Sequence, residues 1–124
     1  MNSLAIKRVA LGIYIAGFSV GVVTHSLDFL RYGLRPYSWG PLPLEIFWSS
    51  LVLLDALVVG ALLTGRMRIG LVLAAAIMVV DVAVNFYAMT VLSMDGFEFP
   101  LTVQSIFLGF VLGSIGFLWP AQHG

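Results

Sequence analysis

Residues 69–92 read IGLVLAAAIMVVDVAVNFYAMTVL, twenty-four residues that are apolar almost throughout. As an α-helix this stretch rises roughly 36 Å, at about 1.5 Å per residue, and this length is enough to cross a hydrocarbon core of about 30 Å with some tilt. Asp81 lies at its middle, and Asn85 follows one helical turn later. A carboxylate at the centre of a membrane helix costs about 2.5–3.5 kcal/mol on insertion scales. We therefore expect the rest of the chain to surround Asp81, so that it faces protein, water or a ligand.

The composition indicates that a lipid bilayer is the solvent and the main partner of this chain. Of the 124 residues, 60% are hydrophobic and 10% are charged, whereas about a quarter of the residues in a soluble domain carry a charge. The formal net charge is zero and no basic cluster exceeds two residues. The chain therefore lacks the positive patch that nucleic-acid binding requires.

Chemistry that depends on cysteine or on a metal is not supported. The chain has no cysteine, which excludes a disulfide, a thiolate metal site and a catalytic thiol. His25 and Asp28 supply only two possible metal ligands, fewer than a stable site needs. The sequence also has no glycine-rich phosphate loop. We predict neither a metal nor a cofactor.

The hydropathy pattern predicts one all-α domain over residues 1–124, an integral membrane bundle of four transmembrane helices in up-down-up-down order. The helices are expected at residues 9–27, 46–63, 69–92 and 101–119. Only residues 64–68 separate the second helix from the third, so these two must form an antiparallel hairpin. In the connection 29–43, three prolines prevent a continuous helix, and we expect this connection to form a compact cap over the bundle.

Two Gly-xxx-Gly pairs mark helix faces that permit close approach of another helix. The pairs are Gly17 with Gly21 and Gly109 with Gly113. Such faces serve packing within the chain or between chains. We expect the protein to be a homodimer or a subunit of a larger membrane complex.

Basic residues near the ends of the spans predict the orientation of the chain. One side carries Lys7, Arg8, Arg66 and Arg68, and the other carries Arg31 and Arg35. This asymmetry predicts that both termini are cytoplasmic (N-in/C-in). The expected location is the plasma (inner) membrane, as a multi-pass protein.

Polar residues inside the spans define the predicted binding site. Asp55 lies about 13 Å from the outer start of the second helix, and Asp81 lies about 18 Å from the inner start of the third. Both are therefore expected near the midplane, with further polar groups toward the outer ends of the helices. The predicted ligand-binding residues are Asp55, Asp81, Asn85, Trp48, Glu45, His25, Asp28 and Gln104.

We expect Asp55 and Asp81 to turn inward and to share a space between the second and third helices. Two acids that share a low-dielectric space are not expected both to ionise, so the pair is predicted to hold at least one proton at neutral pH. Such a pair can bind an organic cation, protonate an alkene or relay protons. The structural alternative is that a neutral Asp only hydrogen-bonds a neighbouring helix. Likewise, His25 can be an ordinary interfacial histidine, and Glu45 an N-terminal acid favoured by the helix dipole.

Four features resemble the EXPERA group of four-helix membrane proteins, which includes the sigma-2 receptor and the emopamil-binding sterol isomerase. They are LGIY at 11–14, the acid Asp28 closing the first helix, SLVLLD at 50–55 and LTVQS at 101–105. The resemblance implies a four-helix fold whose acidic pocket binds amphiphilic amines or sterols. In the enzymatic members it implies acid-assisted isomerisation of a double bond.

A second stretch, LPLE at 42–45 followed by Phe47, is similar to part of the Pro-x-Glu-Glu motif of small carotenoid cyclase subunits. Position 46 is isoleucine, where that motif has its second glutamate. This similarity implies cyclase chemistry on an isoprenoid.

The leading functional prediction is binding or transport rather than catalysis. A small apolar or cationic molecule would enter an outward-facing intramembrane pocket lined by Asp55, Asp81 and Asn85. Two alternatives stay open. The first is an isomerase or cyclase of isoprenoid or sterol type that uses the same acids as general acid and base. The second is a structural subunit without a ligand, whose acids pair with helices of a partner.

Overall fold

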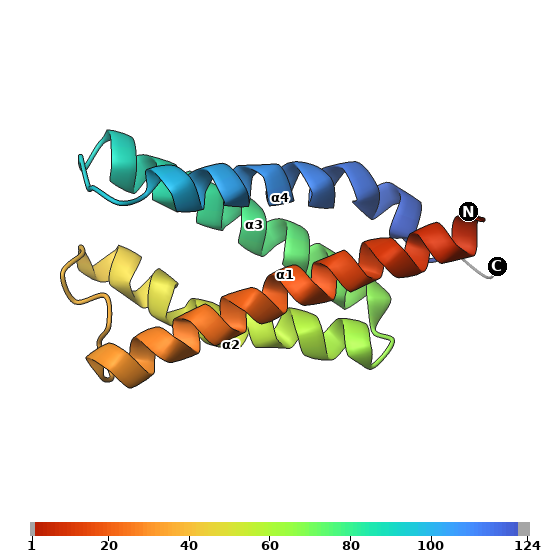
Figure 1. The fold of residues 1–124 in the computed structure, drawn as a ribbon, viewed down its shortest axis with the longest axis horizontal. Helices are drawn as coiled ribbons and strands as arrows, with labels where there is room; N and C mark the ends of the chain where they lie inside the picture. Colours follow the sequence, from red (N-terminus) through yellow and green to blue (C-terminus); the bar gives the residue numbers. More distant parts are fainter. Residues whose placement is uncertain (1, 122–124) are drawn as a thin grey trace.

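The computed structural model describes residues 2–121, which form four helices (Figure 1). They are α1 (Ser3–Tyr32), α2 (Leu42–Leu63), α3 (Met67–Thr90) and α4 (Glu98–Leu118). All four are long and apolar enough to cross a membrane. Large apolar side chains such as Leu53 and Ile106 are exposed on the outside of the bundle, as expected for a surface that faces lipid. The prediction of an all-α fold with four helices of membrane-spanning length is confirmed.

The helices pack in chain order. The main contacts are α1 with α2, α2 with α3 and α3 with α4, whereas α1 and α4 share fewer contacts than these neighbours do. Consecutive helices run in opposite directions (Figure 1). The start of α1, the α2–α3 turn at residues 64–66 and the end of α4 lie together, and we call this the terminal end. The connections at residues 33–41 and 91–97 lie at the opposite, loop end.

All four helices begin before the predicted limits, and local sequence features explain the extensions of α1, α2 and α4. The side chain of Asn2 accepts a hydrogen bond from an N–H of the first turn, so α1 starts at residue 3 rather than 9. It continues until Gly33, whose φ of 85° ends the helix with a bond to the Phe29 carbonyl. In α2 and α4, Pro43 and Pro100 lie within the first turn. A missing N–H costs no helical bond there.

The second and third helices form the antiparallel hairpin that the short turn predicts. Gly65, with a φ of 78°, adopts the left-handed backbone of this turn. Just beyond the turn, Gly70 of α3 packs so closely on Leu62 of α2 that a Cβ at position 70 would overlap the Leu62 side chain. At their C-terminal ends, α3 stops at Thr90 and α4 at Leu118, slightly before the predicted limits of 92 and 119.

The first and last helices meet in the half of the bundle near the terminal end. The buried Tyr14 hydroxyl donates a hydrogen bond to the Val111 carbonyl at 3.0 Å and lies 2.9 Å from the Ser114 hydroxyl. One turn further on, Gly17 faces the Phe107 ring of α4. The close approach that Gly17 permits is therefore used within the chain.

The connection at residues 33–41 folds back over the loop end. Its Tyr37 side chain is buried, and the Trp39 indole N–H donates to the Pro36 carbonyl at 3.1 Å. The Tyr37 and Trp39 rings contact Trp48 of α2, with centroid separations of 6.1 and 5.3 Å. The connection is compact, and it closes one end of the space between the helices.

Candidate functional site

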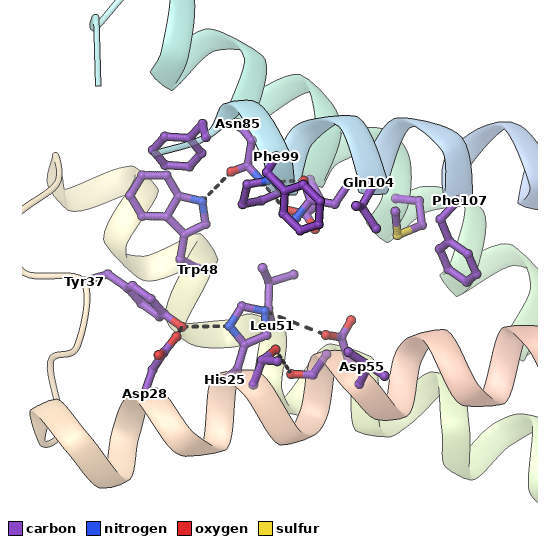
Figure 2. A pocket seen from close by; sticks show the side chains of 18 of the residues that line it. His25, Asp28, Tyr37, Trp48, Leu51, Asp55, Asn85, Phe99, Gln104 and Phe107 are labelled. Atoms are coloured by element: carbon purple, nitrogen blue, oxygen red, sulfur yellow. Dashed lines mark hydrogen bonds and ion pairs between the residues drawn. The ribbon is translucent and has the colours of Figure 1, made fainter. Parts of the chain in front are cut away.

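One cavity of about 820 Å³ occupies the part of the bundle near the loop end (Figure 2). All four helices and both connections at this end contribute to its walls. Seven of the eight side chains singled out in the sequence line it: His25, Asp28, Trp48, Asp55, Asp81, Asn85 and Gln104. The fold thus brings together polar groups that are scattered along the whole chain.

The eighth residue, Glu45, does not line this cavity. Its side chain is buried, but it accepts two hydrogen bonds from Arg35, from Nε at 2.7 Å and from Nη2 at 2.9 Å. These bonds raise the pKa of the Arg35 guanidinium above its usual range. Because Glu45 lies in the first turn of α2, its carboxylate reaches the connection that precedes the helix. Its observed contact is an anchor for that connection.

A first set of polar contacts joins α1, the connection at residues 33–41 and α2. The Tyr37 hydroxyl donates to Asp28 Oδ2 at 2.6 Å and lies 2.7 Å from His25 Nδ1. The other ring nitrogen of His25, Nε2, lies 4.0 Å from Asp55 Oδ2. Burial, together with the hydrogen bond to Asp28, raises the pKa of Tyr37, so this phenol keeps its proton. These four side chains form a continuous polar strip, which Figure 2 shows from the connection to the interior.

A second set of polar contacts joins α2, α3 and α4. Asn85 is its centre: its amide oxygen accepts from the Trp48 indole N–H at 2.8 Å. Its amide nitrogen donates to Asp81 Oδ1 at 3.0 Å and to Gln104 Oε1 at 2.8 Å. One buried amide therefore ties three helices together, and it orients the Asp81 carboxylate along the cavity wall.

Asp55 and Asp81 are both buried and both line the cavity, but each has its own partner. Asp55 faces His25, whereas Asp81 accepts from Asn85. Within residues 2–121 no hydrogen bond joins the two carboxyl groups directly. The sequence-based expectation that they share a space agrees with the cavity lining. Their sharing of a proton stays a prediction.

Aromatic side chains form a rim that was not among the predicted site residues. Tyr37, Trp39, Phe97, Phe99 and Phe107 all line the cavity. The Phe97 ring stacks on that of Trp48, with centroids 5.7 Å apart. These residues lie in connections or on a helix that is apolar on all sides, so neither periodicity nor charge distinguishes them. For Tyr37, its position in a proline-rich connection was the only available signal.

Most of the polar groups that face the cavity are hydrogen-bond acceptors. The described residues contain no cluster of three or more His, Asp or Glu side chains that could hold a metal ion. Carboxylates, an imidazole and an amide inside apolar walls can hold a cationic or hydrogen-bond-donating group. Comparison of the chain with protein-family models, with curated proteins and with solved structures gives no match.

Proposed function

We propose that this protein binds, and in a membrane moves, a small apolar molecule that carries a cationic group. The observation that carries the proposal is the cavity itself. Its volume of about 820 Å³ lies within the range of about 300–1,000 Å³ that is typical of small-molecule sites. Its walls are mainly apolar, and the carboxyl groups of Asp55 and Asp81 lie inside it.

The charge of the lining favours a cation. The acids that line the cavity are Asp28, Asp55, Asp81 and Asp95, and in the described part of the chain none of the lining residues is Lys or Arg. A buried carboxylate without a cationic partner is costly. A ligand that brings a positive charge to Asp55 or Asp81 lowers this cost, so it is held more tightly than a neutral molecule of the same shape.

The gap between α1 and α4 supports entry from the lipid. These helices meet at Tyr14, near the terminal end, and have the smallest contact of any adjacent pair. At the other half of the gap, Val20, Phe99 and Val103 line the cavity and are also exposed on the surface of the bundle, by 61%, 78% and 48%. A ligand with an alkyl chain could place that chain between these side chains while its cationic group reaches the acids.

We place the terminal end in the cytoplasm. Lys7 and Arg68 both lie at this end, where they pack on the rings of Phe117 and Trp119 at 5.3 and 6.0 Å. The terminal end carries four basic residues, Lys7, Arg8, Arg66 and Arg68, whereas the loop end carries two, Arg31 and Arg35. The positive-inside rule therefore favours cytoplasmic termini in the plasma membrane and a cavity that lies toward the outer leaflet.

Binding of matched amphiphiles tests the proposal. Radiolabelled dodecylamine, dodecanol and dodecanoate are offered to the protein in lipid nanodiscs, and empty nanodiscs correct for partitioning into lipid. We expect saturable binding of the amine that the alcohol competes for weakly. Asp55→Asn and Asp81→Asn should each weaken it by roughly tenfold or more, since one lost charge-assisted hydrogen bond is worth about 1.5–3 kcal/mol.

The control variant is Glu98→Gln, which removes an exposed charge outside the cavity and should leave binding unchanged. Equal affinity for amine and alcohol, or equal loss in the control variant, would refute a cation site. Amine uptake into proteoliposomes that is lost in Asp81→Asn would identify transport. A chemically altered isoprenoid recovered from the protein would instead favour the isomerase or cyclase alternative.

A further inference from the structure

A second, smaller cavity lies on the outer side of the connection at residues 33–41. Its volume is about 570 Å³, and its walls include the exposed side chains of Tyr32, Arg35 and Ser38. Asp28 and Tyr37 line both this loop-side cavity and the large membrane cavity. These two side chains are therefore part of the wall that separates the surface from the interior of the bundle.

Hydrogen-bond directions determine where the protons lie along this wall. Tyr37 donates its only O–H hydrogen to Asp28, so its oxygen must accept from His25 Nδ1. A neutral His25 ring then carries its hydrogen on Nδ1 and has a bare lone pair on Nε2. This lone pair faces Asp55 Oδ2 at 4.0 Å.

Two bare acceptors that face each other inside an apolar bundle repel. The pair is stable when one proton lies between the two atoms, either on the Asp55 carboxyl or on His25 Nε2. A movement of about 1 Å by either side chain brings the atoms within hydrogen-bond distance. Proton transfer between Asp55 and His25 therefore needs only a small rearrangement.

We propose that Asp28, Tyr37 and His25 form a proton-transfer chain that connects Asp55 with the water on the loop side. In the outward direction, Asp55 gives its proton to His25 Nε2. The ring passes its Nδ1 hydrogen to the Tyr37 oxygen, and Tyr37 passes its own hydrogen to Asp28, which loses it to water. Three O–H or N–H bonds break and three form, so one proton leaves Asp55 and one appears on Asp28. Reverse transfer or a flip of the imidazole resets the chain.

The titratable groups that surround the proton-transfer chain are compatible with this path. The titratable side chains that line the membrane cavity are His25 and Asp28 on α1, Tyr37 in its connection, Asp55 on α2, Asp81 on α3 and Asp95 in the second connection. On α4 the polar lining residue is Gln104, which is not titratable, and on the outer side Arg35 is held by Glu45. Asp81 and Asp95 lie outside the proposed path, and within it Tyr37 is the side chain that joins His25 to Asp28.

Infrared spectroscopy after a rapid pH step tests this chain in nanodiscs without any added ligand. The carboxyl band of Asp55 is identified by its loss in Asp55→Asn, and the rate at which it follows the step is measured. In general acid–base catalysis, a side chain positioned to transfer a proton accelerates a reaction by about 10²–10⁴-fold. In Tyr37→Phe, which keeps the ring packing but removes the bridging hydroxyl, we expect this rate to fall roughly 100-fold.

Tyr32→Phe is the matched control, because it removes a hydroxyl from the loop-side cavity but not from the chain. It should leave the rate unchanged. If Tyr37→Phe does not fold, Asp28→Asn replaces it: the amide can still accept from Tyr37 but cannot take up the proton. An unchanged rate in a folded Tyr37→Phe or Asp28→Asn variant, or an Asp55 band that never responds to pH, would overturn the proposal. Because this experiment uses no ligand, a negative result would not refute the proposed cation site. A negative result in the amine-binding assay would likewise not refute the proton-transfer chain.

Discussion

Gly21 of α1 lies directly against the Asp55 carboxylate of α2, so closely that a methyl group at Gly21 would overlap Asp55 Oδ2. The carboxylate lies alongside the α1 backbone only because position 21 has no side chain. The Gly17/Gly21 pair therefore serves the interior of this chain, with Phe107 over the first glycine and Asp55 beside the second.

Gly21→Ala should displace the Asp55 carboxylate. We expect a destabilisation of about 1–3 kcal/mol, the usual cost of overpacking, together with weaker binding of dodecylamine. Thermal unfolding and the nanodisc binding assay measure the two effects. Gly12→Ala on the same helix is the control, because a Cβ at position 12 meets nothing within 4 Å. A variant at position 21 that binds and unfolds like the control would contradict this close contact.

The second prediction concerns the Trp48–Asn85 hydrogen bond. Trp48→Phe keeps an aromatic ring beside Phe97 but removes the indole N–H that Asn85 accepts at 2.8 Å. Leaving a buried acceptor without a donor costs about 1–3 kcal/mol, so we expect the variant to unfold at a clearly lower temperature. Trp39→Phe is the comparison, since Trp39 is 60% exposed and water can replace its hydrogen bond. Equal effects of the two substitutions would show that burial of the acceptor is unimportant.

Glu45 gives the third prediction, because the structure separates it from the other seven candidate residues. Glu45→Gln should leave amine affinity within about twofold of the parent, since this side chain contacts Arg35 rather than the cavity. The backbone amides of residues 33–41 should instead exchange hydrogen for deuterium faster, as the anchor of the connection is weakened. A large loss of binding without faster exchange would place Glu45 in the site after all.

The fourth prediction tests orientation, and the absence of cysteine from the chain makes it simple. Ser38→Cys places a single thiol in the connection at the loop end, and Thr64→Cys places one in the turn at the terminal end; both positions are exposed. With cytoplasmic termini, a membrane-impermeant maleimide should label the first variant in intact cells and label the second only after lysis. The reverse pattern would invert the proposed topology.

The sequence alone was sufficient to predict four helices of membrane-spanning length. Membrane-spanning length and hydropathy are local properties, so four apolar segments predict four helices whatever packs beside them. The prediction of the antiparallel hairpin followed from the shortness of the connection at residues 64–68. The same counting along each helix identified Asp55, Asp81 and Asn85 as polar groups within apolar spans.

Only the tertiary structure decided which way each helix faces. These helices are apolar on nearly all sides, so hydropathy does not distinguish their inner from their outer faces, and their rotation depends on side-chain packing between segments far apart. That packing turns Glu45 toward Arg35, folds Tyr37 back onto His25 and brings Phe107 over Gly17. Counting along a helix gives the position of a residue within that helix. A binding site depends instead on which residues of the other helices lie opposite it.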